Sequence, residues 1–154
     1  MGKNKHEIDG IDEKIMQELA RDSSRSYRRI ASDVGLSPAT LVERVKALER
    51  RGYITGYGAR LDYEKLGFEF MAIVEVHMSG KDLLEQEAKI ARIPHVAAVW
   101  DITGGYDSLI VVMCKSRREL SATVKRILST EGVRKTNTNV VLNVVSRLTE
   151  FDEV

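Results

Sequence analysis

The spacing of apolar residues changes near Phe68, and this change most constrains the fold. Before it, apolar side chains recur every three or four positions, as on one face of an α-helix; after it, FEFMAIVEVHM alternates as a β-strand does. A chain of 154 residues can form one ordinary domain or two small ones. We therefore expect a first domain over residues 1–60, a connection over 61–67 and a second domain over 68–154.

Three short helices are predicted in the first domain. The second begins after Ser26 and ends at Gly35, a residue that commonly stops helices. Ser37 then caps the third helix, and Pro38 takes its first position, where the missing N–H costs nothing. A short helix, a tight turn and a capped second helix form a helix-turn-helix. The stretch YITGYGARL, residues 53–61, is expected to follow as a short β-hairpin, or wing.

Basic residues are concentrated around this motif. Residues 1–60 hold 12 Lys/Arg against 9 Asp/Glu, whereas residues 61–154 hold 12 against 14, and residues 21–60 alone hold 9 against 4. Such asymmetry suggests a nucleic-acid partner, and the third helix has small polar residues at its start and bases further along, as in a helix that enters the major groove. The alternatives are a solvated basic face and, for Arg44, a pair with the neighbours of Glu43 or a helix cap. The DNA-contact candidates on these grounds are Arg28, Arg29, Thr40, Arg44, Lys46, Arg50 and Arg51.

The second domain is predicted to have the element order βαββαβ. An internal repeat supports this order, because an offset of 37 places Val74 on Val111 and Val96 on Val133. Two βαβ-like units of this kind indicate an α+β ferredoxin-like sandwich. Both faces of its sheet are apolar, since Met71 and Ile73 point away from Val74, and two helices cover only one face. We expect a second copy of the chain to cover the other face, and Trp100 to pack in that interface or in the core.

Three stretches together resemble one family. They are IDGIDEKIMQEL, SYRRIASDVGLSPATLVERVKALERRGYITGYGARLDYEKLG and VAAVWDITGGYDSLIVVM, which span nearly the whole chain. The chain resembles the Lrp/AsnC, or feast/famine, transcriptional regulators. The resemblance implies a winged helix-turn-helix joined to a ligand-sensing domain of the RAM type, which forms dimers and often octamers and binds amino acids between dimers. By motif it places Ser37, Pro38, Thr40 and Arg44 in the recognition-helix signature, and Gly105, Tyr106 and Asp107 in the effector-associated turn.

The turn from Gly104 to Asp107 also has suitable chemistry for an amino acid. Glycine N–H groups could hold a carboxylate, and Asp107 could hold an ammonium group. The alternative is that Asp107 only closes the hairpin through its own backbone. We expect a β-branched residue at Gly105 to strain the turn and Asp107→Ala to spare folding. Thr136 and Thr138 are weaker effector-binding candidates.

The leading function is therefore a sequence-specific DNA-binding regulator with an amino-acid effector. The alternatives are an enzyme like the sirohaem decarboxylases, to which the resemblance extends, and an architectural protein that coats DNA. Cys114 is the only cysteine, so we expect it to fill the core, and His77 and His95 are expected to lack a nearby acid or thiol cluster. We accordingly expect no catalytic site, no metal site and no cofactor. The chain has no membrane-length apolar run and no signal-peptide pattern at its start, which predicts a cytoplasmic protein.

Overall fold

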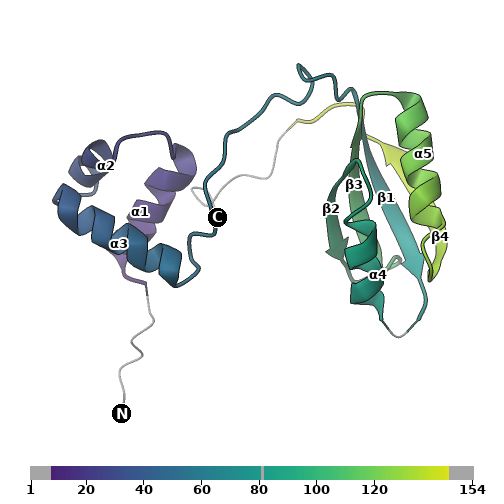
Figure 1. The fold of residues 1–154 in the computed structure, drawn as a ribbon, viewed down its shortest axis with the longest axis horizontal. Coiled ribbons are helices and arrows are strands. Elements are labelled where there is room, and N and C mark those ends of the chain that lie inside the picture. The colour runs from purple at the N-terminus through teal and green to yellow at the C-terminus, as the bar shows by residue number, and fades with distance from the viewer. Residues whose placement is uncertain (1–7, 81, 146–154) are drawn as a thin grey trace, which may run out of the picture. The chain divides into compact units, whose positions relative to one another are not determined.

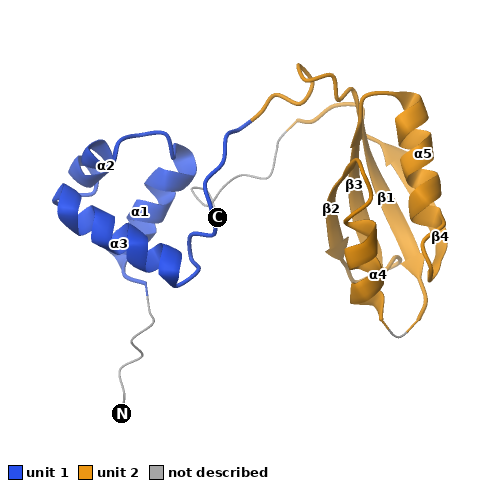
Figure 2. Ribbon diagram, in the orientation of Figure 1, with its two compact units in different colours: residues 1–60, 146–154 blue, residues 61–145 orange. Residues whose placement is uncertain are grey.

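The chain forms two compact units (Figure 2). The computed structural model describes residues 8–80 and 82–145, so the described parts are residues 8–60 of the first unit and residues 61–80 and 82–145 of the second. Each unit has its own cluster of buried apolar side chains. Each can therefore be described by itself.

The first unit consists of α1 (Gly10–Arg21), α2 (Tyr27–Asp33) and α3 (Pro38–Arg50) (Figure 1). Local signals explain where these helices begin. Asp9 caps α1 in a capping box with Asp12, and Ser37 caps α3 by accepting a hydrogen bond from the Thr40 N–H. The predicted helix-turn-helix is confirmed. Its core consists of the buried residues Ile15, Leu19, Ile30, Ala31, Leu41, Val45 and Leu48.

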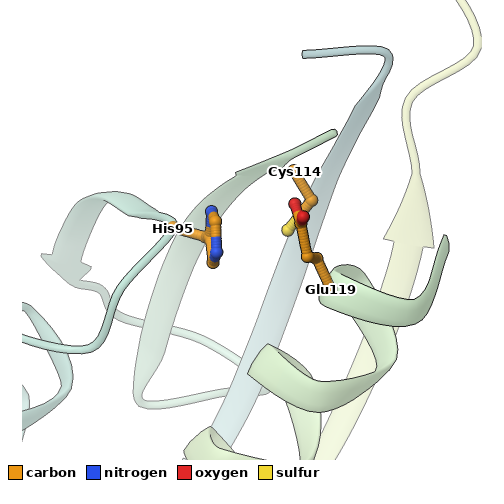
Figure 3. Close-up of side chains that lie close together, drawn as sticks. All are labelled: His95, Cys114 and Glu119. Carbon is orange, nitrogen blue, oxygen red and sulfur yellow. The ribbon is translucent and has the colours of Figure 1, made fainter. Parts of the chain in front are cut away.

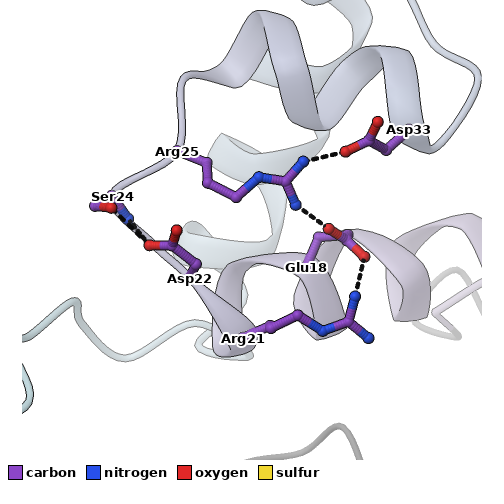
Figure 4. A network of polar contacts seen from close by, with 6 residues as sticks. All are labelled: Glu18, Arg21, Asp22, Ser24, Arg25 and Asp33. Atoms are coloured by element: carbon purple, nitrogen blue, oxygen red, sulfur yellow. Dashed lines mark hydrogen bonds and ion pairs between the residues drawn. The ribbon is translucent and has the colours of Figure 1, made fainter.

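A polar network joins α1 to α2 (Figure 4). The guanidinium of Arg25 bonds to both Glu18 on α1 and Asp33 on α2, and these carboxylates raise its pKa. Arg21 adds a 3.1 Å contact to Glu18. Both arginines belong to the basic segment 21–60, so part of its positive charge pairs with acids inside the protein.

The β-hairpin expected over residues 53–61 does not form, so this part of the prediction is wrong. Residues 53–69 contain turns but no strand. Gly56 and Gly58 weaken strand formation, and the described part of this unit offers no strand for the segment to pair with. The segment instead bonds to the helices: the Tyr57 hydroxyl donates to Glu49 at 2.8 Å, and Arg60 donates to the Ala20 carbonyl at 3.1 Å.

The second unit has the predicted βαββαβ order (Figure 1). Its sheet is antiparallel throughout, in the strand order β2-β3-β1-β4, so the α+β ferredoxin-like sandwich is confirmed. The elements are β1 (Phe70–Met78), α4 (Leu83–Ile90), β2 (Val96–Asp101), β3 (Ser108–Cys114), α5 (Arg117–Leu128) and β4 (Val133–Val140).

The sheet has one face packed against helices and one without a helix, where apolar side chains of β1, β2 and β3 adjoin the polar side chains of Glu75, Asn137 and Asn139. On β1, burial alternates, and the buried side chains join Ile90 of α4 and Ile127 of α5 in one core. The other face, which we call the open face, is only half-buried in the single chain. Trp100 lies on this face opposite Leu109 and is 43% exposed, so it is not a core residue of the single chain. The apolar residues of the open face are Met71, Ile73, Ala98, Trp100, Leu109, Val111 and Met113.

Candidate DNA-binding and effector-binding sites

The N-terminus of α3 is exposed and locally rigid. The Ser37 hydroxyl oxygen accepts from the Thr40 N–H at 3.1 Å and lies 2.8 Å from the Thr40 hydroxyl. Ser37, Pro38 and Thr40 are all exposed. The start of the predicted recognition helix is therefore free to approach a base edge or a phosphate.

Cations without internal partners lie on α2 and α3. Arg28, Arg29, Lys46 and Arg50 are exposed, and none of their side chains has a hydrogen bond or ion pair to another residue of 8–80 or 82–145. Lys46 and Arg50 are four positions apart, so they share one face of α3. Arg51 differs, because its guanidinium lies over the ring of Tyr53, 4.8 Å from the centroid.

Arg44 is held inside the first unit. Its Nη1 lies 2.8 Å from Asp9 Oδ2 and 2.8 Å from Asp12 Oδ1, and its side chain is 31% exposed. Backbone hydrogen bonding from Asp12, and then Arg44 itself, lowers the pKa of Asp9. Arg44 is therefore paired inside the protein, but with acids at the start of α1 rather than with the neighbours of Glu43. A DNA contact by Arg44 stays a prediction. It requires the Arg44 guanidinium to leave Asp9 and Asp12 and bind DNA instead.

In the effector-associated turn, the residue with a positive φ is Gly104 rather than Gly105. Gly104 has φ +126°, a conformation that side chains rarely adopt, whereas Gly105 has no such φ, and a Cβ there would meet open space. The expected strain from a β-branched residue at Gly105 is therefore wrong, and that strain belongs to Gly104.

Asp107 bonds to the neighbouring strand. Its Oδ2 accepts a 2.8 Å hydrogen bond from the Met78 N–H and lies 3.6 Å from His77 Nδ1. The His77 ring stacks on Tyr106 with centroids 4.5 Å apart. Replacing Asp107 by alanine would leave the Met78 N–H without this acceptor, so the expectation that Asp107→Ala spares folding needs correction. The sequence analysis also missed His77, which lies beside this acid because β1 and β3 pair with Val76 opposite Ser108.

The structure does not place Thr136 and Thr138 beside Asp107. They pair with Val76 and Val74, whose buried side chains face the helices. Successive side chains on a strand point to opposite faces, so His77, and Asp107 beside it, lie toward the open face. The structure brings together only Tyr106, Asp107 and the unpredicted His77. An effector contact by either threonine stays a prediction.

His95 also has chemical neighbours that were not expected. One donor atom each from His95, Cys114 and Glu119 lies within 4.8 Å of the others (Figure 3). The expectation that no acid or thiol cluster lies near either histidine is therefore wrong for His95, whereas His77 has the single acid Asp107 beside it. Cys114 itself is fully buried in the core, as predicted.

No helix among the described residues is long and apolar enough to cross a membrane. A helix-turn-helix with unpaired cations, followed by a βαββαβ domain, defines a DNA-binding regulator with a second, sensory domain. The AsnC-type helix-turn-helix domain matches residues 8–49, and the Lrp/AsnC ligand binding domain matches residues 71–151. The chain therefore belongs to the Lrp/AsnC family of transcriptional regulators.

Individual relatives agree with this assignment. An HTH-type transcriptional regulator of Pyrococcus furiosus is 44% identical over 139 residues, which cover 90% of this chain and 94% of that protein. A Neisseria meningitidis regulator in complex with L-methionine has a TM-score of 0.85 at 27% identity, covering 92% of this chain and 94% of that one. A feast or famine regulatory protein from M. tuberculosis, also complexed with L-methionine, has a TM-score of 0.86 at 28% identity, covering 94% and 98%. These matches favour neither the enzyme nor the DNA-coating alternative.

Proposed function

We propose that the chain binds specific operator DNA as a dimer, through the N-terminus of α3, and that an α-amino acid changes its DNA affinity. The DNA-binding part of this proposal rests on the exposed, capped start of α3 and on cations whose side chains are unpaired: Arg28, Arg29, Lys46 and Arg50. Phosphate contacts by such cations position a protein on DNA, and the helix N-terminus reads the bases.

The open face supports the dimer. Each large apolar side chain fully buried there is worth about 1.5–3 kcal/mol, so the apolar residues of that face together make a monomer scarce. A two-fold dimer presents two α3 helices to half-sites about one DNA turn, or a multiple of it, apart. The operator is then palindromic. Assembly of dimers into octamers is the further step that the family resemblance implies.

The part of the proposal that concerns amino-acid binding rests on the turn from Gly104 to Asp107. Its glycine N–H groups suit a carboxylate, and the Asp107 carboxylate, which lies 40% exposed beside His77, suits an ammonium group. Methionine is bound by the Neisseria meningitidis and M. tuberculosis proteins, which makes it the first amino acid to test. An amino acid at a contact between dimers must favour one assembly over another, with a typical coupling of about 1–3 kcal/mol.

The test is selection of bound fragments from a random duplex library by the purified chain, with and without the twenty amino acids. Recovery of a short palindrome, and a changed affinity for it with one amino acid, supports the proposal. The matched control is the double variant Lys46→Ala/Arg50→Ala, which should recover no palindrome. Uniform recovery of all sequences would instead indicate a DNA-coating protein.

A further inference from the structure

We propose that His95, Cys114 and Glu119 form a Zn²⁺ site in the second unit, separate from the DNA and amino-acid sites. Three elements supply the donors: His95 immediately precedes β2, Cys114 ends β3 and Glu119 lies in the first turn of α5 (Figure 3). Their donor atoms all lie within 4.8 Å of one another. No second group of three or more His, Cys, Asp or Glu of this kind occurs among residues 8–80 and 82–145.

Backbone hydrogen bonds hold two of these residues in place. The His95 carbonyl accepts from the Met113 N–H at 2.9 Å, next to Cys114 in sequence. The Glu119 Oε2 accepts from the Lys115 N–H at 2.9 Å. The first bond fixes the His95 backbone beside β3, and the second orients the Glu119 carboxylate, as an outer hydrogen bond to a metal ligand does.

The backbone of His95 is unusual. Its φ of +73° makes it the one non-glycine residue with positive φ in the described chain. Left-handed backbone at a non-glycine residue costs energy and is concentrated at functional sites, although histidine adopts it more readily than most residues. This backbone places the His95 imidazole beside the Cys114 thiol and the Glu119 carboxylate.

The donor set matches zinc. Imidazole nitrogen, thiolate sulfur and carboxylate oxygen bind Zn²⁺ at about 2.0–2.3 Å, which places neighbouring donors about 3.3–3.6 Å apart in a tetrahedron. The present separations of up to 4.8 Å exceed this spacing by about 1 Å, so the donors must move closer together when the metal binds. Three protein ligands leave the fourth position for water.

Binding must release the Cys114 proton to solvent, because the thiolate is the metal ligand. Burial raises the pKa of the Cys114 thiol, and the nearby Glu119 charge raises it further, although a hydrogen bond with Thr123 lowers it.

The experiment uses the full chain after treatment with a chelator, titrated with Co²⁺ and then with Zn²⁺. We expect one Co²⁺ per chain with a thiolate-to-cobalt charge-transfer band, which Zn²⁺ abolishes by displacement, and a rise in the thermal midpoint of unfolding. His95→Gly is the sharpest variant, because glycine accepts the positive φ and the fold is retained. His95→Gly and Glu119→Gln should each weaken binding at least about tenfold, and Cys114→Ser should remove the charge-transfer band.

The matched control is His77→Gln, which removes an imidazole outside the cluster and should bind Co²⁺ as the wild type does. Circular dichroism of each variant establishes that it is folded; if Cys114→Ser does not fold, His95→Gly decides the question. The proposal is overturned if the wild type shows no charge-transfer band, if the band persists unchanged in His95→Gly, or if His77→Gln loses it.

Discussion

The guanidinium of Arg44 lies 2.8 Å from the carboxylate of Asp12, which is 32 positions earlier in the chain. The Asp12 side chain is only 11% exposed, so this pair lies at the edge of the core between α1 and α3. Asp9 adds a second 2.8 Å contact from the cap of α1. Arg44 therefore holds two helices together, whether or not it also touches DNA.

Arg44→Ala should destabilise the first unit. It leaves the nearly buried Asp12 carboxylate without its cation, and the expected loss is about 1–2 kcal/mol after allowance for solvent screening. Lys46→Ala, which removes an unpaired cation from the same helix, should leave stability unchanged within about 0.5 kcal/mol. Urea unfolding followed by circular dichroism checks both variants, and equal stability of the two would contradict a structural role for Arg44.

Acid should weaken the cap of α1. The pKa of Asp9 in the folded chain lies below the ordinary value of 3.8, so its contribution to stability is complete above that value and is lost as the pH falls through the lowered pKa. Asp9→Asn retains a good helix cap but cannot titrate. The urea midpoint of unfolding, measured from pH 6 to pH 2, should be higher for the wild type than for Asp9→Asn at pH 6, and this difference should shrink below pH 4. A difference that stays constant with pH would argue against this role of Asp9.

DNA affinity should depend on the unpaired cations. Substituting alanine for Arg28, Arg29, Lys46 or Arg50 should lower the slope of log affinity against log salt by about 0.9 for each phosphate that the protein no longer neutralises. Fluorescence anisotropy with a duplex at several salt concentrations measures that slope. Lys125→Ala, which removes an exposed lysine from α5, is the control and should keep the wild-type slope. Unchanged slopes in all four variants would mean that DNA binds elsewhere.

Dimerisation should depend on the open face. Val111 pairs with Ile73 and Ala98 at the middle of that face, so Val111→Lys places a charge in the proposed interface and should shift the protein to monomer. Leu84→Lys changes a side chain on α4 that is already 71% exposed and should leave the oligomer intact. Light scattering at micromolar concentration distinguishes these results, and a wild-type monomer would exclude the dimer.

Asp107→Asn should weaken amino-acid binding and retain the fold. The amide oxygen can still accept from the Met78 N–H, whereas the charge that would hold an ammonium group is removed. The expected cost is about 1.5–3 kcal/mol, the value of a hydrogen bond between charged groups. Calorimetric titration with methionine first, and then the other amino acids, gives the measurement. Asp101→Asn on β2 is the control, and equal affinities in both variants would remove Asp107 from the site.

Local sequence patterns predicted most of the fold. The cap at Ser37, the proline at 38 and the alternation through β1 act over a few neighbouring positions, so the helix-turn-helix and the βαββαβ order were correct. The hairpin over residues 53–61 failed because a strand needs a partner, and no described strand of that unit supplies one. Helix periodicity also predicted the exposure of Lys46 and Arg50, but not the partial burial of Arg44 on the same helix.

Only the tertiary structure decided which distant side chains meet. Arg44 reaches Asp12 through the packing of α1 on α3, and His95 reaches Cys114 and Glu119 through the pairing of β2 with β3 and the start of α5. The strand register likewise separates Thr136 from Asp107, because neighbouring positions on a strand face opposite sides of the sheet. Caps and periodicity are read from adjacent residues, whereas these contacts depend on how separate elements pack, which no short segment encodes.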